Sequence, residues 1–296
     1  MGVKIVQRDN LILLTQPHLI QQLLEDTGLV GSKPAPTPSL VADPLDRNVD
    51  GKSHAERWNY RSVIGKLNFL EKSTRPDIAY AVHQCARFSE SPKENHSKAV
   101  KRIIRYLAGT KDKGLELRPS SANPPQVDCY VDADFCGNWT PHTALNDPVT
   151  AKSRTGYVLR LAGCPLVWAS KLQTETALST TEAEYIALST ALREAIPLMN
   201  LVSEVQRLQV ATIYGRAAVH CKVFEDNSGA LELARTPKMR PRTKHINVKL
   251  HHFREHVEKG VISIHSVSTL QQLADIFTKS LGVELFYRFR KAILGW

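Results

Sequence analysis

The stretch Val127-Asp128-Cys129-Tyr130-Val131-Asp132 decides how this chain is expected to fold. Its valine, cysteine and tyrosine residues are typical of a strand, and the strand ends on an acidic residue, Asp132. Residues 118–125 precede it and read Arg-Pro-Ser-Ser-Ala-Asn-Pro-Pro, which is a strong break in regular structure. We therefore place a domain boundary just before this strand.

Downstream of the boundary, strand and helix patterns follow one another. The expected strands are 127–132, 155–161, 165–169, 220–225 and 261–267, and the expected helices are 182–193, 198–208, 228–234, 248–259 and 270–281. The second and third strands form a hairpin around Ala162-Gly163-Cys164. This order predicts a mixed α/β sheet.

Upstream of the boundary the patterns are helical. Helices are expected at 16–27, 59–71, 77–87 and 97–108. Alternating prolines at 34, 36 and 38 forbid a helix there and predict an extended linker that continues to about Lys52.

Composition and charge limit the class of protein. The chain has 296 residues, of which 42% are hydrophobic and 23% charged, so a wholly disordered or fibrous protein is excluded. The 39 basic and 29 acidic residues give a net charge of +10, which favours a polyanionic partner such as nucleic acid. The five cysteines contain no Cys-x-x-Cys, so a disulfide framework or a Cys-rich zinc ribbon is not expected. No apolar run is long enough to span a membrane, and we expect no membrane partner.

The helix at 97–108 carries two different faces. Its apolar residues form one stripe, whereas a second stripe is cationic and consists of Lys98, Lys101, Arg102 and Arg105. This cationic stripe is either a solvated surface or a set of contacts for a phosphate backbone, and periodicity alone favours neither interpretation.

Four acidic residues stand where an α/β sheet gathers its ligands. Asp132 and Asp226 each end a strand, Glu184 lies in the long helix, and Asp275 lies near the start of the last helix. Converging carboxylates repel one another, and a hard divalent cation removes that repulsion. Oxygen ligands suit Mg²⁺ or Mn²⁺ better than zinc, and two such ions catalyse phosphoryl transfer. A basic protein with such a site suggests a nuclease, although any one such acidic residue, taken alone, is more often a helix cap or a surface charge than a ligand.

Motifs spread along the chain resemble those of one family. They are Cys129-Tyr130-Val131-Asp132-Ala133-Asp134-Phe135, Ser153-Arg154-Thr155-Gly156-Tyr157, Trp168-Ala169-Ser170-Lys171-Leu172-Gln173, Glu182-Ala183-Glu184-Tyr185, Glu225-Asp226-Asn227-Ser228-Gly229-Ala230, Thr243-Lys244-His245-Ile246 and Leu273-Ala274-Asp275-Ile276-Phe277-Thr278-Lys279. Through them the chain resembles the ribonuclease H domain of copia-type LTR retrotransposon Pol polyproteins. Two further motifs, Leu13-Leu14-Thr15-Gln16-Pro17 and Thr74-Arg75-Pro76-Asp77-Ile78-Ala79-Tyr80, resemble the segment between polymerase palm and ribonuclease H in these polyproteins.

The resemblance implies a fold and a domain organisation. We expect an α/β, ribonuclease H-like mixed five-stranded sheet with flanking helices, preceded by a smaller, mainly helical thumb or connection region. The expected domains are the end of the polymerase region with its linker at 1–52, the helical thumb or connection segment at 53–118, and the ribonuclease H-like domain at 127–284. The stretch 138–152 is long for its connection and is expected to be a loop insertion.

The resemblance also implies an activity: hydrolysis of the RNA strand of RNA–DNA hybrids by catalysis with two Mg²⁺ or Mn²⁺ ions. Asp132 matches the first catalytic aspartate, with Asp134 as the weaker alternative, and Glu184 fits better than Glu182, which lies roughly 200° away around the helix. Asp226 and Asp275 complete the metal and catalytic set.

Contacts to the phosphates of the hybrid are expected from the cationic stripe and from Lys244 and His245. A zinc site among His245, His251, His252 and His256 is not favoured, because no further ligand is spaced to complete it.

We expect the chain to be a piece of a Pol polyprotein without the polymerase palm, since the spacing of Asp132 and Asp134 does not match the adjacent aspartates of a polymerase motif. The polymerase part of Pol is then a second partner besides the hybrid. The expected location is intracellular, either cytoplasmic in a virus-like particle or nuclear. Two alternatives to the nuclease stay open: a catalytically silent nucleic-acid-binding remnant, and, ranked last, an integrase, for which no His-His-Cys-Cys module is present.

Overall fold

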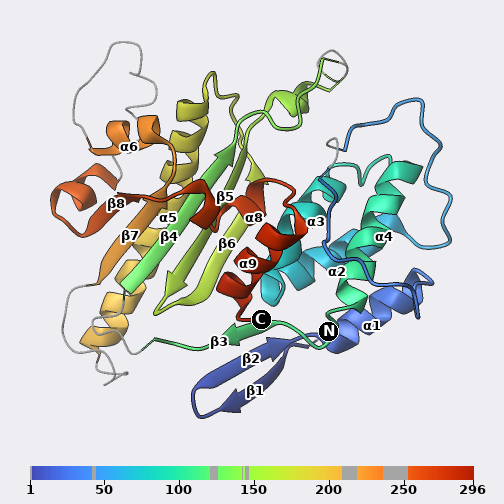
Figure 1. Ribbon diagram of the computed structural model, residues 1–296, viewed down its shortest axis with the longest axis horizontal. Coiled ribbons are helices and arrows are strands. Elements are labelled where there is room, and N and C mark those ends of the chain that lie inside the picture. The colour runs from blue at the N-terminus through green and yellow to red at the C-terminus, as the bar shows by residue number, and fades with distance from the viewer. Residues whose placement is uncertain are drawn as a thin grey trace. The chain divides into compact units, whose positions relative to one another are not determined.

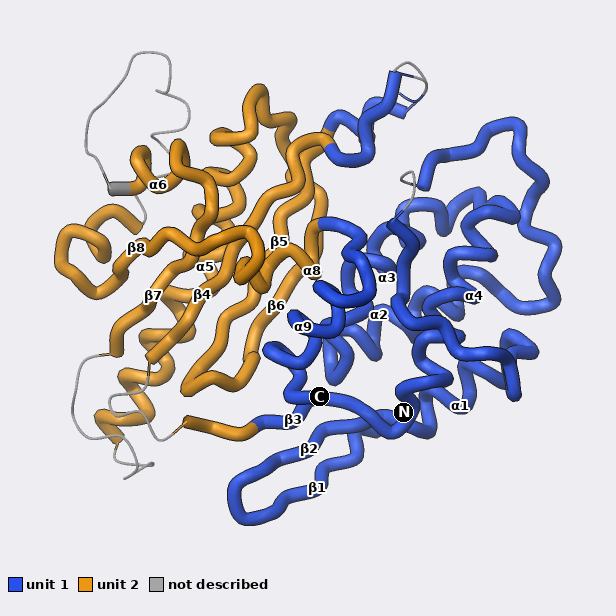
Figure 2. The backbone as a smooth tube through the Cα atoms, in the orientation of Figure 1, with its two compact units in different colours: residues 1–117, 137–151, 279–296 blue, residues 118–136, 152–278 orange. Residues whose placement is uncertain are grey.

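The structure, a computed structural model, describes residues 2–41, 45–120, 126–141, 143, 147–208, 219–235 and 253–296 (Figure 1). The chain forms two compact units (Figure 2): unit 1 consists of residues 1–117, 137–151 and 279–296, and unit 2 of residues 118–136 and 152–278. These units differ from the expected domains. Unit 1 covers the ranges expected as the first two domains. It also contains residues 137–151, all of which were expected in the ribonuclease H-like domain, and residues 279–296, of which only 279–284 were expected there.

Unit 2 is built on a five-stranded sheet with the order β6-β5-β4-β7-β8. Its strands are β4 (Gln126–Asp134), β5 (Arg154–Leu161), β6 (Cys164–Leu172), β7 (His220–Glu225) and β8 (Ile262–Ser266). Neighbours β4, β5 and β6 pair antiparallel, whereas β7 pairs parallel with both β4 and β8. The expected mixed five-stranded sheet with flanking helices is confirmed.

One face of this sheet packs on the long helix α5 (Thr180–Arg207), which lies alongside β4 and β7 in Figure 1. Inward-facing residues of the central strand β4 and its neighbour β7, among them Val127, Cys129 and Val223, form one hydrophobic core with Ala183 and Leu188 of α5. The remaining described helices of unit 2 are α6 (Ser228–Arg235), a helix at 253–258, the 3-10 turn η4 (Thr269–Gln271) and α8 (Asp275–Thr278). The start of the helix expected at 248–259 lies outside the described residues.

Two helix predictions in this unit were wrong. The helices expected at 182–193 and 198–208 are one continuous helix, because Pro197 lies on its exposed face, where water can satisfy the carbonyl that loses its intrahelical partner. The single helix expected at 270–281 is broken after η4, where the backbone of Gln272 turns to an extended conformation. The Gln272 amide donates instead to the carbonyl of Val131 at 2.8 Å, which holds this residue against the sheet.

Unit 1 is mainly helical, as expected. Its helices are α1 (Pro17–Asp26), α2 (Tyr60–Ser73), α3 (Ala79–Ala86), α4 (Glu94–Ala108) and α9 (Val283–Leu294), with 3-10 turns η1 (Pro76–Ile78) and η2 (Pro148–Ala151). It also contains a three-stranded antiparallel sheet that the sequence analysis did not predict, made of β1 (Lys4–Arg8), β2 (Leu11–Thr15) and β3 (Leu115–Leu117). The apolar stripe of α4 is fully buried and packs against α1 and α3.

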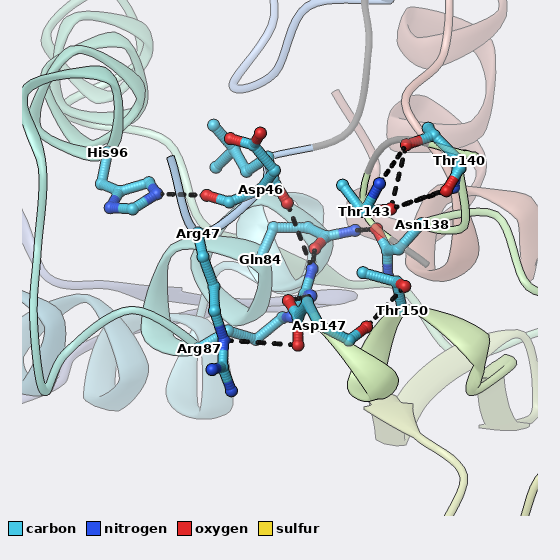
Figure 3. Close-up of polar contacts among 11 residues, drawn as sticks. Asp46, Arg47, Gln84, Arg87, His96, Asn138, Thr140, Thr143, Asp147 and Thr150 are labelled. Carbon is cyan, nitrogen blue, oxygen red and sulfur yellow. Dashed lines mark hydrogen bonds and ion pairs between the residues drawn. The ribbon is translucent and has the colours of Figure 1, made fainter. Parts of the chain in front are cut away.

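The segment 137–151 connects β4 to β5 and packs on α3 through polar side chains (Figure 3). Gln84 of α3 donates to Asn138 at 2.9 Å, and both side chains are buried. Arg47 and Arg87 form ion pairs with the buried carboxylate of Asp147, at 3.4 and 3.5 Å. The described residues of the insertion expected at 138–152 therefore contact unit 1 through buried polar groups, with Asn138 and Asp147 as the anchoring side chains.

The C-terminal helix α9 joins the same unit around a buried charge pair. Arg75 is fully buried and donates to both carboxylate oxygens of Asp77, at 2.9 and 2.8 Å, and Tyr106 donates to that carboxylate at 2.6 Å. Arg290 of α9 donates to the Tyr106 hydroxyl at 3.3 Å, and the Trp296 indole donates to the carbonyl of Gly114 at 2.6 Å. These contacts explain why residues after Thr278 belong to unit 1.

Candidate metal centre

Three carboxylates of unit 2 converge. Asp132, Glu184 and Asp226 each offer one oxygen, and these oxygens all lie within 4.8 Å of one another. Among the described residues this is the one group of three or more His, Cys, Asp or Glu side chains close enough to hold a metal ion.

The fold explains this convergence. Asp132 lies near the carboxyl end of β4, and Asp226 directly follows the parallel neighbour β7, so both acids reach the same edge of the sheet. The Gln272 amide donates to carbonyls of both strands, Val131 at 2.8 Å and Phe224 at 3.3 Å, and thereby fixes the two strand ends relative to one another.

Helix α5 supplies the third carboxylate from its second turn. Two hydrogen bonds close its first turn: the hydroxyl of the N-cap residue Ser179 accepts from the backbone N–H of Glu182 at 3.1 Å, and the Glu182 carboxylate accepts from the backbone N–H of Leu178, just before the N-cap, at 2.8 Å. Glu182 thus stabilises the helix start, which leaves Glu184 as the glutamate that faces the other two acids. Asp134, the alternative to Asp132, lies outside the group of three described carboxylates.

The fourth expected residue, Asp275, is the first residue of α8 and is buried. The described geometry does not include it in the group of three mutually close oxygens. Its helix nevertheless touches the site, since the hydroxyl of Thr278 donates a hydrogen bond to Asp132 Oδ2. The carboxylate of Asp226 is held in the same way, because the Thr269 hydroxyl donates a hydrogen bond to its Oδ2 at 3.0 Å.

Burial and repulsion dominate the electrostatics of the site. Burial raises the pKa of Glu184 well above its ordinary value, and the negative charges of Glu225, Asp132 and Asp226 raise it further, against a stabilising hydrogen bond from the backbone of Ala133. Glu184 Oε2 is buried without a hydrogen-bond partner. A carboxylate in this state is costly unless a cation neutralises it, and an all-oxygen donor set fits Mg²⁺ or Mn²⁺.

The sequence analysis missed one acidic residue beside this group. Glu225 ends β7 and is completely buried, and burial raises the pKa of its carboxyl well above the ordinary value although the backbone N–H of Asn227 opposes the shift. The signal that could have revealed it is the alternation of the strand, in which Cys221 and Val223 point into the core and Glu225 continues the same face.

The expected nucleic-acid contacts on α4 all have partners within unit 1. Lys98 pairs with Glu94 at 2.8 Å and Lys101 with Glu56 at 2.6 Å. The two arginines bind the Pro-rich linker: Arg102 donates to the Thr37 hydroxyl at 2.9 Å and Arg105 to the Lys33 carbonyl at 2.7 Å. Lys98 is largely exposed, and a pocket of about 450 Å³ opens beside Lys98, Arg102 and Arg105. Lys244 and His245 lie outside the described residues.

Histidines of unit 2 form no metal site among the described residues. His251 and His252 lie outside them. In the adjacent strands β7 and β8, the Ser263 hydroxyl lies 2.7 Å from a ring nitrogen of both His220 and His265, so these imidazoles have local partners.

Comparison with known proteins gives matches along almost the whole chain. No protein-family model matches it. The "Retrovirus-related Pol polyprotein from transposon RE1" of Arabidopsis thaliana is 34% identical over 281 residues, which are 95% of this chain and 18% of that polyprotein. The corresponding polyprotein from transposon TNT 1-94 of Nicotiana tabacum is 35% identical over 286 residues, which are 94% of this chain and 20% of that polyprotein. The chain thus spans about a fifth of the length of these relatives.

A solved structure of the N-terminal RNase H domain of rv2228c from Mycobacterium tuberculosis, fused to maltose binding protein, is 16% identical with a TM-score of 0.35 and covers 56% of this chain and 97% of that one. Within the described parts of the chain, no helix is both long enough and apolar enough to cross a bilayer.

Proposed function

Since the chain belongs to the family of copia-type retrotransposon Pol polyproteins, we propose that it is a metal-dependent ribonuclease H, which hydrolyses the RNA strand of RNA–DNA hybrids. The observation that carries this proposal is the convergence of Asp132, Glu184 and Asp226, whose carboxylate oxygens lie within 4.8 Å of one another. Converging carboxylates, here the buried Asp132 and Glu184 with the partly exposed Asp226, are typical of sites that hold Mg²⁺ or Mn²⁺ for phosphoryl transfer.

Asp132, Glu184 and Asp226 would hold the divalent cations, with Asp275 as the fourth carboxylate from α8. When bound, a pair of Mg²⁺ or Mn²⁺ ions supplies the Lewis acidity that phosphodiester hydrolysis needs. The buried oxygen of Glu184 that has no hydrogen-bond partner supports this assignment, because a bound cation would satisfy it.

The side chains around these acids hold the ligands in place before substrate arrives. Thr278 donates to Asp132 and Thr269 donates to Asp226, so one oxygen of each aspartate is held by a hydroxyl group. Such outer hydrogen bonds orient ligands and keep the oxygens at a constant separation. The residues of the chain therefore contribute position and charge, and no covalent intermediate with the protein is required.

The proposed substrate follows from charge and from the family. Lys98, Lys101, Arg102 and Arg105, together with Lys244 and His245, would contact phosphates of the hybrid, and the 2′-hydroxyl of RNA would distinguish the strand to be cut. Lys98 is the member of the stripe that is most free to turn towards a phosphate, since its side chain is 72% exposed and its only described ion pair is an exposed one on the same helix. The polymerase part of Pol is the proposed protein partner.

A panel of substrates tests this function. The protein is incubated in Mn²⁺ with the same labelled sequence as RNA–DNA hybrid, single-stranded RNA, double-stranded RNA and double-stranded DNA. We expect cleavage of the RNA strand of the hybrid alone. Cleavage of all four substrates would contradict hybrid specificity, and tight binding of the hybrid without cleavage would favour the silent nucleic-acid-binding remnant.

A further inference from the structure

Glu225 is a buried carboxylate that the proposed chemistry does not yet use. Its side chain is 0% exposed at the end of β7. Oε1 accepts a hydrogen bond from the backbone N–H of Asn227 at 3.0 Å, whereas Oε2 is buried and has no hydrogen-bond partner. An unpartnered charged oxygen inside a protein is destabilising unless a cation or a donor compensates it.

The strand geometry places this carboxylate on the side of the sheet that α5 covers. Side chains alternate along β7, and Cys221 and Val223, on the same face as Glu225, belong to the core formed with α5. Glu184 lies on α5, and its carboxylate is within 4.8 Å of those of Asp132 and Asp226. Among the charges that act on Glu184, the repulsion from Glu225 is the largest, ahead of Asp132 and Asp226.

Glu225, like Asp275, is outside the group of three mutually close oxygens, and it is the sequence neighbour of Asp226, which belongs to that group. Glu184 and Glu225 nevertheless share one property: each leaves one buried oxygen without a hydrogen-bond partner. These are Glu184 Oε2 and Glu225 Oε2. If both were ionised, the two carboxylates would repel one another; a proton on one of them, which their raised pKa values favour in the metal-free protein, or a bound cation removes that repulsion. If Glu225 only stabilised the turn before α6, this would explain the hydrogen bond from Asn227 to its Oε1. It would not explain why its Oε2 is buried without a hydrogen-bond partner.

We infer that Glu225 is a further carboxylate of the metal centre, which binds the divalent cation together with Glu184. This inference rests on the proposed function, because it takes Mg²⁺ or Mn²⁺ as the ion of the centre. The number of negative ligands sets the affinity of a carboxylate site for a divalent cation. Removal of the Glu225 charge should therefore weaken metal binding even when substrate is absent.

The test measures Mn²⁺ binding to the whole chain by calorimetry and by electron paramagnetic resonance, without nucleic acid. Glu225→Gln is the decisive variant, because the amide keeps the shape and still accepts from Asn227. Glu255→Gln is the matched control, since Glu255 is an exposed carboxylate of the same unit. We expect Glu225→Gln to raise the dissociation constant for Mn²⁺ by about 10-fold or more, as losses of supporting groups at metal sites do, and Glu255→Gln to leave it unchanged.

A second variant separates charge from folding. Glu225→Asp keeps the negative charge on a shorter side chain, so Mn²⁺ affinity should recover at least in part relative to Glu225→Gln. The melting temperature in EDTA checks that each variant is folded, and that of Glu225→Gln should not fall below the wild-type value because a buried repulsion is removed.

The outcomes distinguish this inference from the proposed function. A Glu225→Gln variant that binds Mn²⁺ as tightly as the wild type overturns the role of Glu225, whether or not the wild type cuts hybrids. A wild type that binds no Mn²⁺ overturns it as well. If Mn²⁺ binding depends on Glu225 but the wild type cuts no hybrid, the metal centre stands and the ribonuclease function fails.

Discussion

Gly156 lies directly opposite Asp132 in the antiparallel pairing of β4 and β5. A Cβ atom at Gly156 would lie 2.6 Å from Thr278 Cγ2 and 2.8 Å from Phe277 Cβ, so the missing side chain is what allows α8 to approach the sheet. That approach brings the Thr278 hydroxyl to Asp132 and positions Asp275 in the same short helix. A residue without catalytic chemistry thus sets the geometry of the metal centre.

Gly156→Ala should displace α8 and destabilise the protein by about 1–3 kcal/mol, the usual cost of an added methyl group in a packed interior. Activity on hybrids should fall as well, because Thr278 and Asp275 move with the helix. Urea unfolding and hybrid cleavage measure the two effects.

Gly65→Ala is the matched control within α2. An added Cβ there meets no atom within 4 Å, and the residue is exposed within a helix, so alanine should stabilise by about 0.4–1 kcal/mol. If Gly156→Ala and Gly65→Ala changed the free energy of unfolding equally, the close contact of α8 with β5 would not be the reason why position 156 requires glycine.

The metal-free protein should lose stability as the pH rises. The pKa values of Glu184 and Glu225 are raised in the folded state by burial and by neighbouring carboxylates. A carboxyl group whose pKa is raised on folding stabilises the folded state when it is protonated. This contribution is complete below the unfolded-state pKa of about 4.3, and it is lost as the pH rises through the pKa of the folded state. In EDTA, the melting temperature of the wild type should therefore decline with pH relative to that of a Glu184→Gln, Glu225→Gln double variant. Parallel pH profiles of the two proteins would contradict this account.

The buried pair of Arg75 and Asp77 should be a large contributor to the stability of unit 1. Asp77→Asn leaves the fully buried guanidinium without its bidentate partner and removes the acceptor of Tyr106, so we expect a loss of about 3–5 kcal/mol in the free energy of unfolding. Asp26→Asn breaks the more exposed pair with Lys66 and should cost less than about 1 kcal/mol. Equilibrium urea unfolding compares the two, and a small cost at Asp77 would refute the proposed importance of the pair.

The cationic stripe of α4 can be tested through salt. If Lys98 and Lys101 contact phosphates, the Lys98→Ala, Lys101→Ala double variant should bind the hybrid more weakly, and the slope of log affinity against log salt should decrease by about 0.7–0.9 for each lost contact. Lys259→Ala is the control, because Lys259 is about as exposed as Lys98 and also forms an i,i+4 ion pair, in the turn that follows the helix at 253–258. An unchanged slope in the double variant would identify the stripe as a solvated surface.

Much of the fold could be predicted because its patterns are local. The strands β4 and β7 and the helix α4 show their buried faces in the period of their apolar residues. The break at Gln272 could not be predicted in this way, since glutamine is a good helix former. It depends on a hydrogen bond to Val131, which is 141 residues away in the chain. The strand β3 similarly depends on its pairing with β2, with Ile12 opposite Leu117.

The site was predicted in part by pattern and in part by resemblance. Strand ends indicated Asp132 and Asp226, but the choice of Glu184 over Glu182 depended on the family motif, and the capping role of Glu182 supplies its physical reason. Glu225 was missed because an acidic residue beside Asp226 looks like an ordinary surface charge in the sequence. Its complete burial depends on tertiary packing around β7, whose Cys221 and Val223 share a core with α5 from a distant part of the chain.

Cleavage of an RNA–DNA hybrid with a labelled RNA strand is the most direct test of the central claim. The wild type, an Asp132→Asn, Asp226→Asn double variant and the Glu255→Gln control are compared in Mg²⁺, in Mn²⁺ and in EDTA. The account predicts that the wild type and the control cut RNA only when the metal is present, and that the double variant is slower by more than about 100-fold, since even supporting groups at metal sites contribute 10- to 100-fold. Cutting that persists in EDTA, or in the folded double variant at the wild-type rate, would contradict it.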